Sequence, residues 1–468
     1  EIDSNQSSFF YNVGNALREQ GRLEESVDAY QQAIEIQPDH ADAYNNVGNA
    51  LREQGRLEES VDAYRQAIEI QPKFAGAHNN LGNALREQGR LEESVDAYQQ
   101  AIEIQPDHAD AYNNLGNALR KQGKLEESIH TYQKAIHIQP DHADAHKNLG
   151  IILLLKGNFF QGWKEYGSRW KCDDIISKNR DLPQPSRDGS NLNGKSILVW
   201  AEQGIGDEIM FTSILPTLSQ MTEKIIIEYN LRLVPLFQRS FPQIPFFSRQ
   251  NLPHPHLLDE NIDYQIPMGG LGRWLRTDED SFDRSKQSYL TACTNRSVRI
   301  RKRYQKLAGG RMLVGISWKS TGINWRRALL KSTVLEDWTS ILSQQDCYFI
   351  NLQYGDVKEE LAQLQQQTGL IIYQDEEIDS LRNLDDFAAQ VSALDLVIST
   401  SNTTVHVAGA LGKPVWTLLS YIPDWRWMLE REDTPWYPSM RLFRQSETGD
   451  WPRIFAQVNS ALEQLYGR

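Results

Sequence analysis

Two adjacent threonines, Thr403 and Thr404, follow an apolar run that ends at Thr400. The surrounding sequence, LDLVISTSNTTVHVAGALGKPVW, is typical of a buried strand, a polar turn, a short helix and a second strand. A helix that begins at Thr403 presents unpaired N–H groups and the positive end of its dipole beside two hydroxyl groups. We therefore expect a phosphate site at the carboxyl end of this strand, although an ordinary α/β crossover without a ligand has the same pattern.

A second turn whose residues could take part in catalysis precedes the run DEIMF. Gly204 and Gly206 permit a sharp strand-to-helix turn, and Asp207 stands at the start of the helix that follows. A carboxylate at this position commonly does no more than stabilise the helix start. Beside Glu202 and Gln203, in a turn that faces a cleft, Asp207 also suits a general base, with its neighbours on the acceptor side.

Four basic residues follow the expected strand MLVGISW, at Lys319, Arg326, Arg327 and Lys331. Loops after parallel strands open at the same edge of a sheet, so this loop is expected next to the phosphate site. A basic loop is usually solvated surface, but its position beside an anion-binding turn favours a phosphate contact.

Several other classes of chemistry are disfavoured. The glycine turn lacks the dinucleotide fingerprint, because Ile209 stands where the third glycine is required, and this argues against a nicotinamide oxidoreductase. The acidic run 278–280 lies in a charged loop with no strand before it, so we expect solvated surface there. The sequence contains no Walker lysine motif, zinc-ligand spacing or nucleophile elbow, which disfavours kinases, metalloenzymes and serine hydrolases.

The elements that would position these residues alternate between β-branched runs and helical segments from Ser196 onward, which predicts a doubly wound α/β architecture. The expected strands are SILVWA, KIIIEY, YQIP, MLVGISW, CYFINLQY, GLIIYQD, DLVIST and PVWTLLS, and the expected helices include 207–221, 335–343 and 384–394. The pattern is weakest between 268 and 311. We place a boundary between two lobes near Ala308, with a cleft that would suit a two-substrate transferase.

The first part of the chain has a different organisation. Prolines recur every 34 residues, at Pro38, Pro72, Pro106 and Pro140. The text between them is nearly repeated, which is the signature of a helical solenoid. Its spacing and residue types resemble the tetratricopeptide repeat over about residues 7–172, as four full repeats and a fifth that degenerates after Gly157.

Asparagines recur in register along these repeats, at Asn12, Asn46, Asn80, Asn114 and Asn148, and three residues later at Asn15, Asn49, Asn83 and Asn117. A spacing of three residues places each pair on one face of a helix. In the tetratricopeptide family this face lines the concave groove, so the resemblance implies that Asn46, Asn80 and Asn114 bind a protein or an extended peptide. Asparagine at these positions also belongs to the general repeat consensus, which is the structural alternative.

Composition sets further limits. The net charge of -13 and the pI of about 5.4 disfavour nucleic acid and anionic membranes as main partners. Three distant cysteines suit a reducing cytosol, and no apolar run is long enough to span a bilayer, so we expect a cytoplasmic protein. The chain begins at Glu1 instead of methionine, which suggests a fragment or a processed form.

All twelve tryptophans lie at or after Trp163, where the strict repeat ends. The aromatic stretch GNFFQGWKEYGSRW is typical of a capping repeat that docks on another domain. The polar stretch that follows, with prolines and a glycine, is predicted to be a linker. The expected domains are a solenoid over 1–172, a linker over 173–194, and two Rossmann-like lobes over 195–307 and 308–468.

Four segments of the two lobes resemble, in order, bacterial glycosyltransferases of the heptosyltransferase-like group that follow tetratricopeptide repeats. These segments are WAEQGIGDEIMF, GISWKSTGINWRRALLKS, DLVISTSNTTVHVAGALGKPVW and DWRWMLEREDTPWYPSMRLFRQ. The resemblance implies the GT-B fold, which has two Rossmann-like lobes. It also implies inverting transfer of a sugar from a nucleotide diphosphate donor, with no required metal or other cofactor.

The resemblance also implies roles for individual residues. Asp207 corresponds to the family's proposed base, Lys331 to the lysine that contacts the leaving phosphates, and Thr403, Thr404 and His406 to the phosphate-binding turn. A single helix histidine is often structural, so His406 has both interpretations.

The chain departs from the family at Ser401 and Asn402, where heptosyltransferases carry aspartate and threonine. Both side chains can still hydrogen-bond a sugar hydroxyl, but the identity of the sugar is in question. We therefore expect a glycosyltransferase whose repeats recruit the acceptor. The alternative is an interaction scaffold with an inactive α/β half.

Overall fold

The computed structural model describes residues 2–172, 180–202, 204–282, 288–320 and 325–466. The chain separates into two compact units. The first comprises Glu1–Ile152 and Glu165–Asp173, and the second comprises Leu153–Lys164 and Asp174–Arg468.

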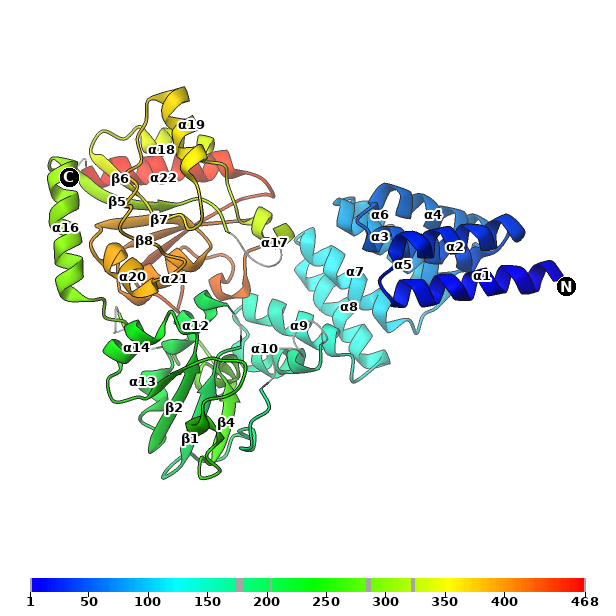
Figure 1. Ribbon diagram of the computed structural model, residues 1–468, viewed down its shortest axis with the longest axis horizontal. Coiled ribbons are helices and arrows are strands. Elements are labelled where there is room, and N and C mark those ends of the chain that lie inside the picture. Colours follow the sequence, from blue (N-terminus) through cyan, green and yellow to red (C-terminus); the bar gives the residue numbers. More distant parts are fainter. Residues whose placement is uncertain (1, 173–179, 203, 283–287, 321–324, 467–468) are drawn as a thin grey trace. The chain divides into compact units, whose positions relative to one another are not determined.

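The first unit is a solenoid of paired antiparallel helices, coloured blue to cyan in Figure 1. Its helices are α1 (Ile2–Glu19), α2 (Leu23–Ile36), α3 (Ala41–Glu53), α4 (Leu57–Ile70), α5 (Ala75–Gln88), α6 (Leu91–Ile104), α7 (Ala109–Lys121), α8 (Leu125–Ile138) and α9 (Ala143–Leu155), the last of which runs on into the second unit. From α1 to α6, each helix contacts its pair partner and the first helix of the next pair, and α8 packs on α7. The predicted repeat architecture is confirmed.

One glycine in each repeat lets the two helices of a pair approach closely. A Cβ atom at Gly48 would lie 2.6 Å from the ring of Tyr64, and one at Gly82 would lie 2.6 Å from Tyr98. Both tyrosine rings are fully buried. A larger residue would push the helices apart, so the glycine that recurs in each repeat reflects a packing constraint.

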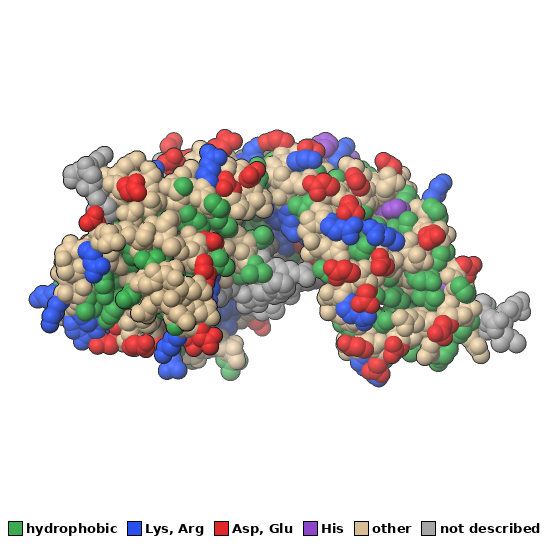
Figure 2. Space-filling view, turned by 90° about the horizontal axis from the view of Figure 1, so that it is seen from above, with side chains coloured by type: hydrophobic (Ala, Val, Ile, Leu, Met, Phe, Trp, Pro, Cys, Tyr) green, Lys and Arg blue, Asp and Glu red, His purple; other side chains and the backbone are tan. Residues whose placement is uncertain are grey.

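Acidic and basic side chains alternate on the surface of these repeats, on the face seen in Figure 2. The first three repeats carry the same exposed pair near the start of the second helix, Arg22 with Glu25, Arg56 with Glu59 and Arg90 with Glu93. Exposed pairs of this kind contribute little to stability, but they keep the surface well solvated.

The second unit contains two parallel sheets, as two Rossmann-like lobes require. In the first sheet the strands are ordered β3-β2-β1-β4. They comprise β1 (Ser196–Trp200), β2 (Lys224–Tyr229), β3 (Phe246–Ser248) and β4 (Tyr264–Pro267). The strand β1 is followed by α12 (Ile205–Thr212), α13 (Leu215–Leu218) precedes β2, and α14 (Val234–Ser240) precedes β3. These are the parallel crossovers that the alternating sequence pattern predicts.

The second sheet has the order β6-β5-β7-β8-β9. Its strands are β5 (Met312–Ser317), β6 (Cys347–Asn351), β7 (Leu396–Thr400), β8 (Val415–Leu419) and β9 (Met440–Arg444). One face packs on α18 (Thr339–Leu342), α19 (Lys358–Thr368) and α22 (Trp451–Tyr466), and α20 (Leu384–Ser392) and α21 (Thr403–Ala410) lie on the other (Figure 1). The β7 strand is buried along its whole length, as expected for a central parallel strand.

Several elements differ from prediction. The expected strand GLIIYQD is wrong, since it forms only a single bridge, between Tyr373 and Ile350 of β6. The expected helix 207–221 is divided into α12 and α13, with Pro216 in the first turn of α13. The basic stretch before the lobe boundary is the helix α16 (Thr294–Ala308), whose arginines pair with acidic residues of the second lobe.

The second half of the fifth repeat belongs structurally to the second unit. Trp163, in α10 (Phe159–Tyr166), donates its indole N–H to the carbonyl of Arg276 at 2.8 Å and packs edge-on against Trp425. A Cβ atom at Gly272 would lie 2.6 Å from the Trp163 ring. The aromatic sequence of this segment therefore reflects packing into the core of the α/β unit.

Among the residues with described positions, no helix combines the length and the apolar character needed to cross a bilayer.

Candidate functional site

The turn between β7 and α21 is held in place by hydrogen bonds of the Asn402 side chain. Asn402 caps α21, and its Oδ1 accepts the N–H of Thr404 at 2.9 Å. Its amide group donates to the Ser317 hydroxyl at 2.8 Å and to the Lys319 carbonyl at 3.2 Å, which ties the turn to the end of β5. The Asn402 side chain therefore organises the turn, and both of its polar atoms are engaged.

The helix begins at Thr403, as predicted. Thr404 is fully buried, and its Oγ1 has no hydrogen-bond partner among the described residues. A buried unsatisfied hydroxyl is uncommon in a native protein and calls for an explanation, such as a ligand or an ordered water. The start of α21 therefore combines the helix dipole with an unused polar atom.

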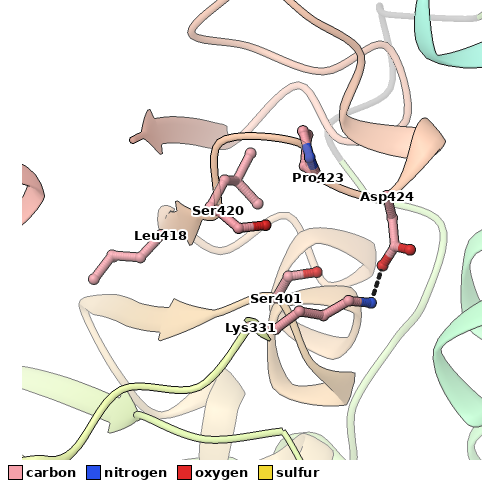
Figure 3. A pocket seen from close by; sticks show the side chains of 7 residues that line it. Lys331, Ser401, Leu418, Ser420, Pro423 and Asp424 are labelled. Carbon is pink, nitrogen blue, oxygen red and sulfur yellow. Dashed lines mark hydrogen bonds and ion pairs between the residues drawn. The ribbon is translucent and has the colours of Figure 1, made fainter. Parts of the chain in front are cut away.

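A small pocket lies beside this turn, at the carboxyl ends of β7 and β8. Its walls include Lys331, Ser401, Ser420, Pro423 and Asp424, and Figure 3 shows Lys331 passing beside Ser401 to reach Asp424. The cavity between these side chains is closed, with a volume of about 0 Å³. Pockets that bind small molecules measure roughly 300–1,000 Å³, so a nucleotide sugar requires a wider opening.

Charged side chains form a continuous chain from this pocket to the first lobe. The ammonium group of Lys331 pairs with Asp424, and Asp424 accepts a second hydrogen bond, at 3.2 Å, from Arg426. Arg426 in turn donates to the carboxylate of Asp207, at the start of α12. The structure thus brings two predicted site residues, Lys331 and Asp207, into one network.

The start of α12 packs directly on α21. A Cβ atom at Gly206 would lie 2.7 Å from Cδ2 of His406 and 3.2 Å from its Nε2. Glycine is required at this position because the helix backbone passes over the imidazole ring. Gly206, which we predicted on the acceptor side, therefore lets the two lobes approach closely.

His406 is enclosed by aromatic rings and by α12. Its Nδ1 shares a hydrogen bond of 2.8 Å with the hydroxyl of Tyr437, and its ring stacks on Trp427 at 5.3 Å. Burial, and secondly the positive charge of Arg426, hold the pKa of His406 well below its usual value. The neutral imidazole is 3 % exposed, which favours the structural interpretation of this residue.

Ser401 is also engaged by a tryptophan. The indole N–H of Trp427 donates to Ser401 Oγ at 2.8 Å. The hydroxyl group can still donate its own proton, so Ser401 lines the pocket as a polar wall.

Two glutamates near α12 have different environments. Glu202 is buried and accepts the backbone N–H of Gly269, so it anchors the short helix η3 (Met268–Leu271). Glu208 accepts the N–H of Asn230 at 2.8 Å, and burial raises its pKa to about 8. A neutral carboxyl group thus lies next to the candidate base in the sequence.

Some predicted residues lie elsewhere or outside the described part of the chain. The backbone carbonyl of Lys319 contacts the turn, but its side chain pairs with Glu360. Gln203 and the side chains of Arg326 and Arg327 lie outside the described residues. Within the described ranges, no group of three histidine, cysteine or acidic residues is arranged to hold a metal ion.

The asparagines of the repeats bond to one another. Asn80 donates its amide to Asn45 of the preceding repeat at 3.0 Å, and Asn114 donates to Asn79 at 3.0 Å. Asn46 donates to Asn15 at 2.9 Å. Asn46, Asn80 and Asn114 are half-buried on the first helices of their pairs. Each therefore has one role in joining repeats and retains partial exposure for a partner.

Sequence reasoning did not find Arg426 or Asp424, which complete the charge network. In the sequence, both residues fall in the segment DWRW, which contributes only to the family resemblance. A buried arginine between two tryptophans is an available signal, because an arginine side chain enclosed by aromatic residues needs a carboxylate partner.

Comparison with known proteins extends to both units. Models of the tetratricopeptide repeat match residues 6–73 and 63–96, and a model described as TPR repeat matches 82–123 and 116–157. Protein FlbA of Caulobacter vibrioides is 32% identical over 325 residues, which are 67% of this chain and 54% of FlbA. The chain thus spans about half the length of this curated relative.

Among solved structures, that of MamA is 22% identical and aligns over 36% of this chain and 98% of its own, with a TM-score of 0.32. Pseudomonas aeruginosa pilF is 18% identical and aligns over 36% of this chain and 78% of its own, with a TM-score of 0.35. Because these family models match it, the helical first part of this chain consists of tetratricopeptide repeats.

Proposed function

We propose that the second unit is a glycosyltransferase of the GT-B type that uses a nucleotide diphosphate sugar, and that the repeats present the acceptor. The observation that carries this proposal is the network that joins Lys331, which lines the pocket beside the α21 turn, to Asp207 at the start of α12. Both ends of the network lie at the carboxyl ends of parallel strands, where such sheets bind ligands.

The chemistry follows from the residue types. Asp207 accepts the proton of an acceptor hydroxyl while the hydroxyl oxygen attacks the anomeric carbon of the sugar. The bond to the nucleotide diphosphate breaks, and its electron pair remains on the departing diphosphate oxygen. Lys331, the N–H groups at the start of α21 and the hydroxyls of Thr403 and Thr404 stabilise that charge. Attack from the opposite side of the bond inverts the anomeric centre.

The repeats supply the acceptor in this proposal. Tetratricopeptide repeats are solenoids, and solenoids bind partners along extended surfaces. The half-buried asparagines Asn80 and Asn114 offer side-chain carbonyl oxygens in register, which suits the backbone of an extended peptide or protein segment. Asn46 lies at the same position of its repeat, but its carbonyl oxygen already accepts from Asn45 and Asn49.

Thermal unfolding with nucleoside diphosphates tests the donor site. A ligand at a concentration one hundred times its Kd stabilises the folded state by about 2.7 kcal/mol, so the midpoint should rise by several degrees with one of ADP, GDP, UDP, CDP or dTDP. Lys331→Ala should remove most of the rise. Lys358→Ala is the matched control, because this lysine is 73% exposed and its Nζ lies as far as 3.9 Å from its partner Glu376.

A protein that none of the five nucleotides stabilises would contradict the enzyme proposal. The scaffold interpretation would then stand, and a bound partner should be insensitive to both lysine substitutions.

A further inference from the structure

Arg426 occupies the centre of an alternating series of charges. It lies in η5 (Trp425–Trp427), and its side chain is 12% exposed. Its guanidinium contacts Asp207 on one side and Asp424 on the other, and Asp424 also holds Lys331. Two cations and two carboxylates therefore neutralise each other along one line.

This arrangement leaves both proposed functional groups engaged. Asp207 Oδ1 accepts a hydrogen bond from Arg426, so this oxygen is occupied and cannot at the same time accept from an acceptor hydroxyl. Lys331 likewise has less attraction for a phosphate while Asp424 compensates its charge. The ion pair between Lys331 and Asp424 also spans the small pocket beside the α21 turn (Figure 3).

A diphosphate carries the charge needed to replace both carboxylates. We propose that Arg426 is a second diphosphate-binding residue, and that Arg426 and Lys331 exchange Asp207 and Asp424 for the diphosphate of the donor. This inference rests on the proposed transferase function. The exchange releases Asp207 to accept the acceptor proton, so the donor binds before the acceptor becomes reactive.

The backbone beside Arg426 gives independent support for such a movement. Met428 has φ 51° and ψ -172°, and Glu430 has φ 55°. In the described part of the chain, these are the only residues other than glycine with positive φ. Such conformations cost about 1–3 kcal/mol each and are concentrated in switch regions and ligand clamps. Strain is therefore stored in the segment that carries Arg426.

Calorimetric titration of the full chain with ADP, GDP, UDP, CDP and dTDP tests the exchange. Asp207→Asn removes a competing carboxylate and should tighten binding of the nucleotide about threefold to tenfold. Arg426→Gln should weaken it about tenfold, and Arg426→Lys should restore part of the loss. In the double variant Asp207→Asn/Arg426→Gln, the tightening should disappear. A purely structural role for Arg426 predicts neither the tightening nor its dependence on Arg426.

The outcomes separate the two proposals. If the wild-type chain binds none of the five nucleotides, the transferase proposal and this inference both fail. If a nucleotide binds but Asp207→Asn leaves its affinity unchanged or weakens it, the exchange is wrong and the donor site remains. Asp424→Asn should also tighten binding, which keeps the inference testable should Arg426→Gln fail to fold.

Discussion

The guanidinium of Arg426 donates a hydrogen bond to the carboxylate of Asp207, and this pair joins positions 219 residues apart in the sequence. The bond links the β8 side of the second lobe to the first helix of the other lobe. It places the proposed base, Asp207, in direct contact with a residue of the second lobe.

Asp207→Asn should abolish sugar transfer while preserving the fold and, as argued above, tightening nucleotide binding. An amide cannot accept the acceptor proton, and general base catalysis contributes about 10²–10⁴-fold to rate. The measurement is release of nucleoside diphosphate from the sugar nucleotide in the presence of acceptor. Asp278→Asn, in an exposed loop, is the control and should leave the rate unchanged. Full activity of Asp207→Asn would remove this residue from the mechanism.

Asn402→Ala should destabilise the second unit by about 2 kcal/mol, because the helix cap and the amide bonds to β5 are both lost. Asn402→Asp is more informative. Aspartate keeps the acceptor for the Thr404 N–H but has no amide to donate, so it should lose only part of the stability. Urea unfolding of the three proteins measures the difference. Equal stabilities for Asn402→Ala and the wild type would contradict the assigned role.

Gly206→Ala should destabilise the lobe contact by about 1–3 kcal/mol, since the new methyl group overlaps the His406 ring. Gly204→Ala is a matched control, because a Cβ there meets only Asp207 Oδ2 at 3.8 Å. Combined with His406→Ala, the Gly206→Ala change should cost less than the sum of the single changes. Simple additivity in chemical unfolding would show that the two residues do not meet.

Glu208 should make stability depend on pH. Its pKa is raised by burial from 4.5 to about 8, so the folded state binds a proton that the unfolded state has released between these values. The stabilising contribution is therefore complete below about pH 4.5 and is lost as the pH rises through about 8. Glu208→Gln should flatten the decline of the unfolding midpoint between pH 5 and pH 8.5 relative to the wild type. An unchanged slope would rule out a buried neutral carboxyl group at this position.

The elements that carry strong local patterns were predictable. The strand that ends at Thr400 and the helix that begins at Thr403 were found because a buried β-branched run meets hydroxyl residues there. The strand β3 was missed because it is only three residues long, and β9 because Arg441 and the aromatic loop before it obscure the pattern.

Contacts between distant segments were beyond prediction. Asp207 and Lys331 were selected by motif, but the pairing of each with the DWRW segment depends on how two lobes close. The packing of His406 against Gly206 could not be inferred either, because the same glycine pattern occurs in any tight turn.

The amide ladder of the repeats has a consequence for their number. Each bond, such as that from Asn80 to Asn45 or from Asn114 to Asn79, joins a helix pair only to the pair before it. A whole 34-residue unit inserted in register would find the same partners on both sides. The amide ladder therefore tolerates a change in the number of repeats. Duplication or loss of a unit changes the length of the solenoid without requiring any compensating substitution.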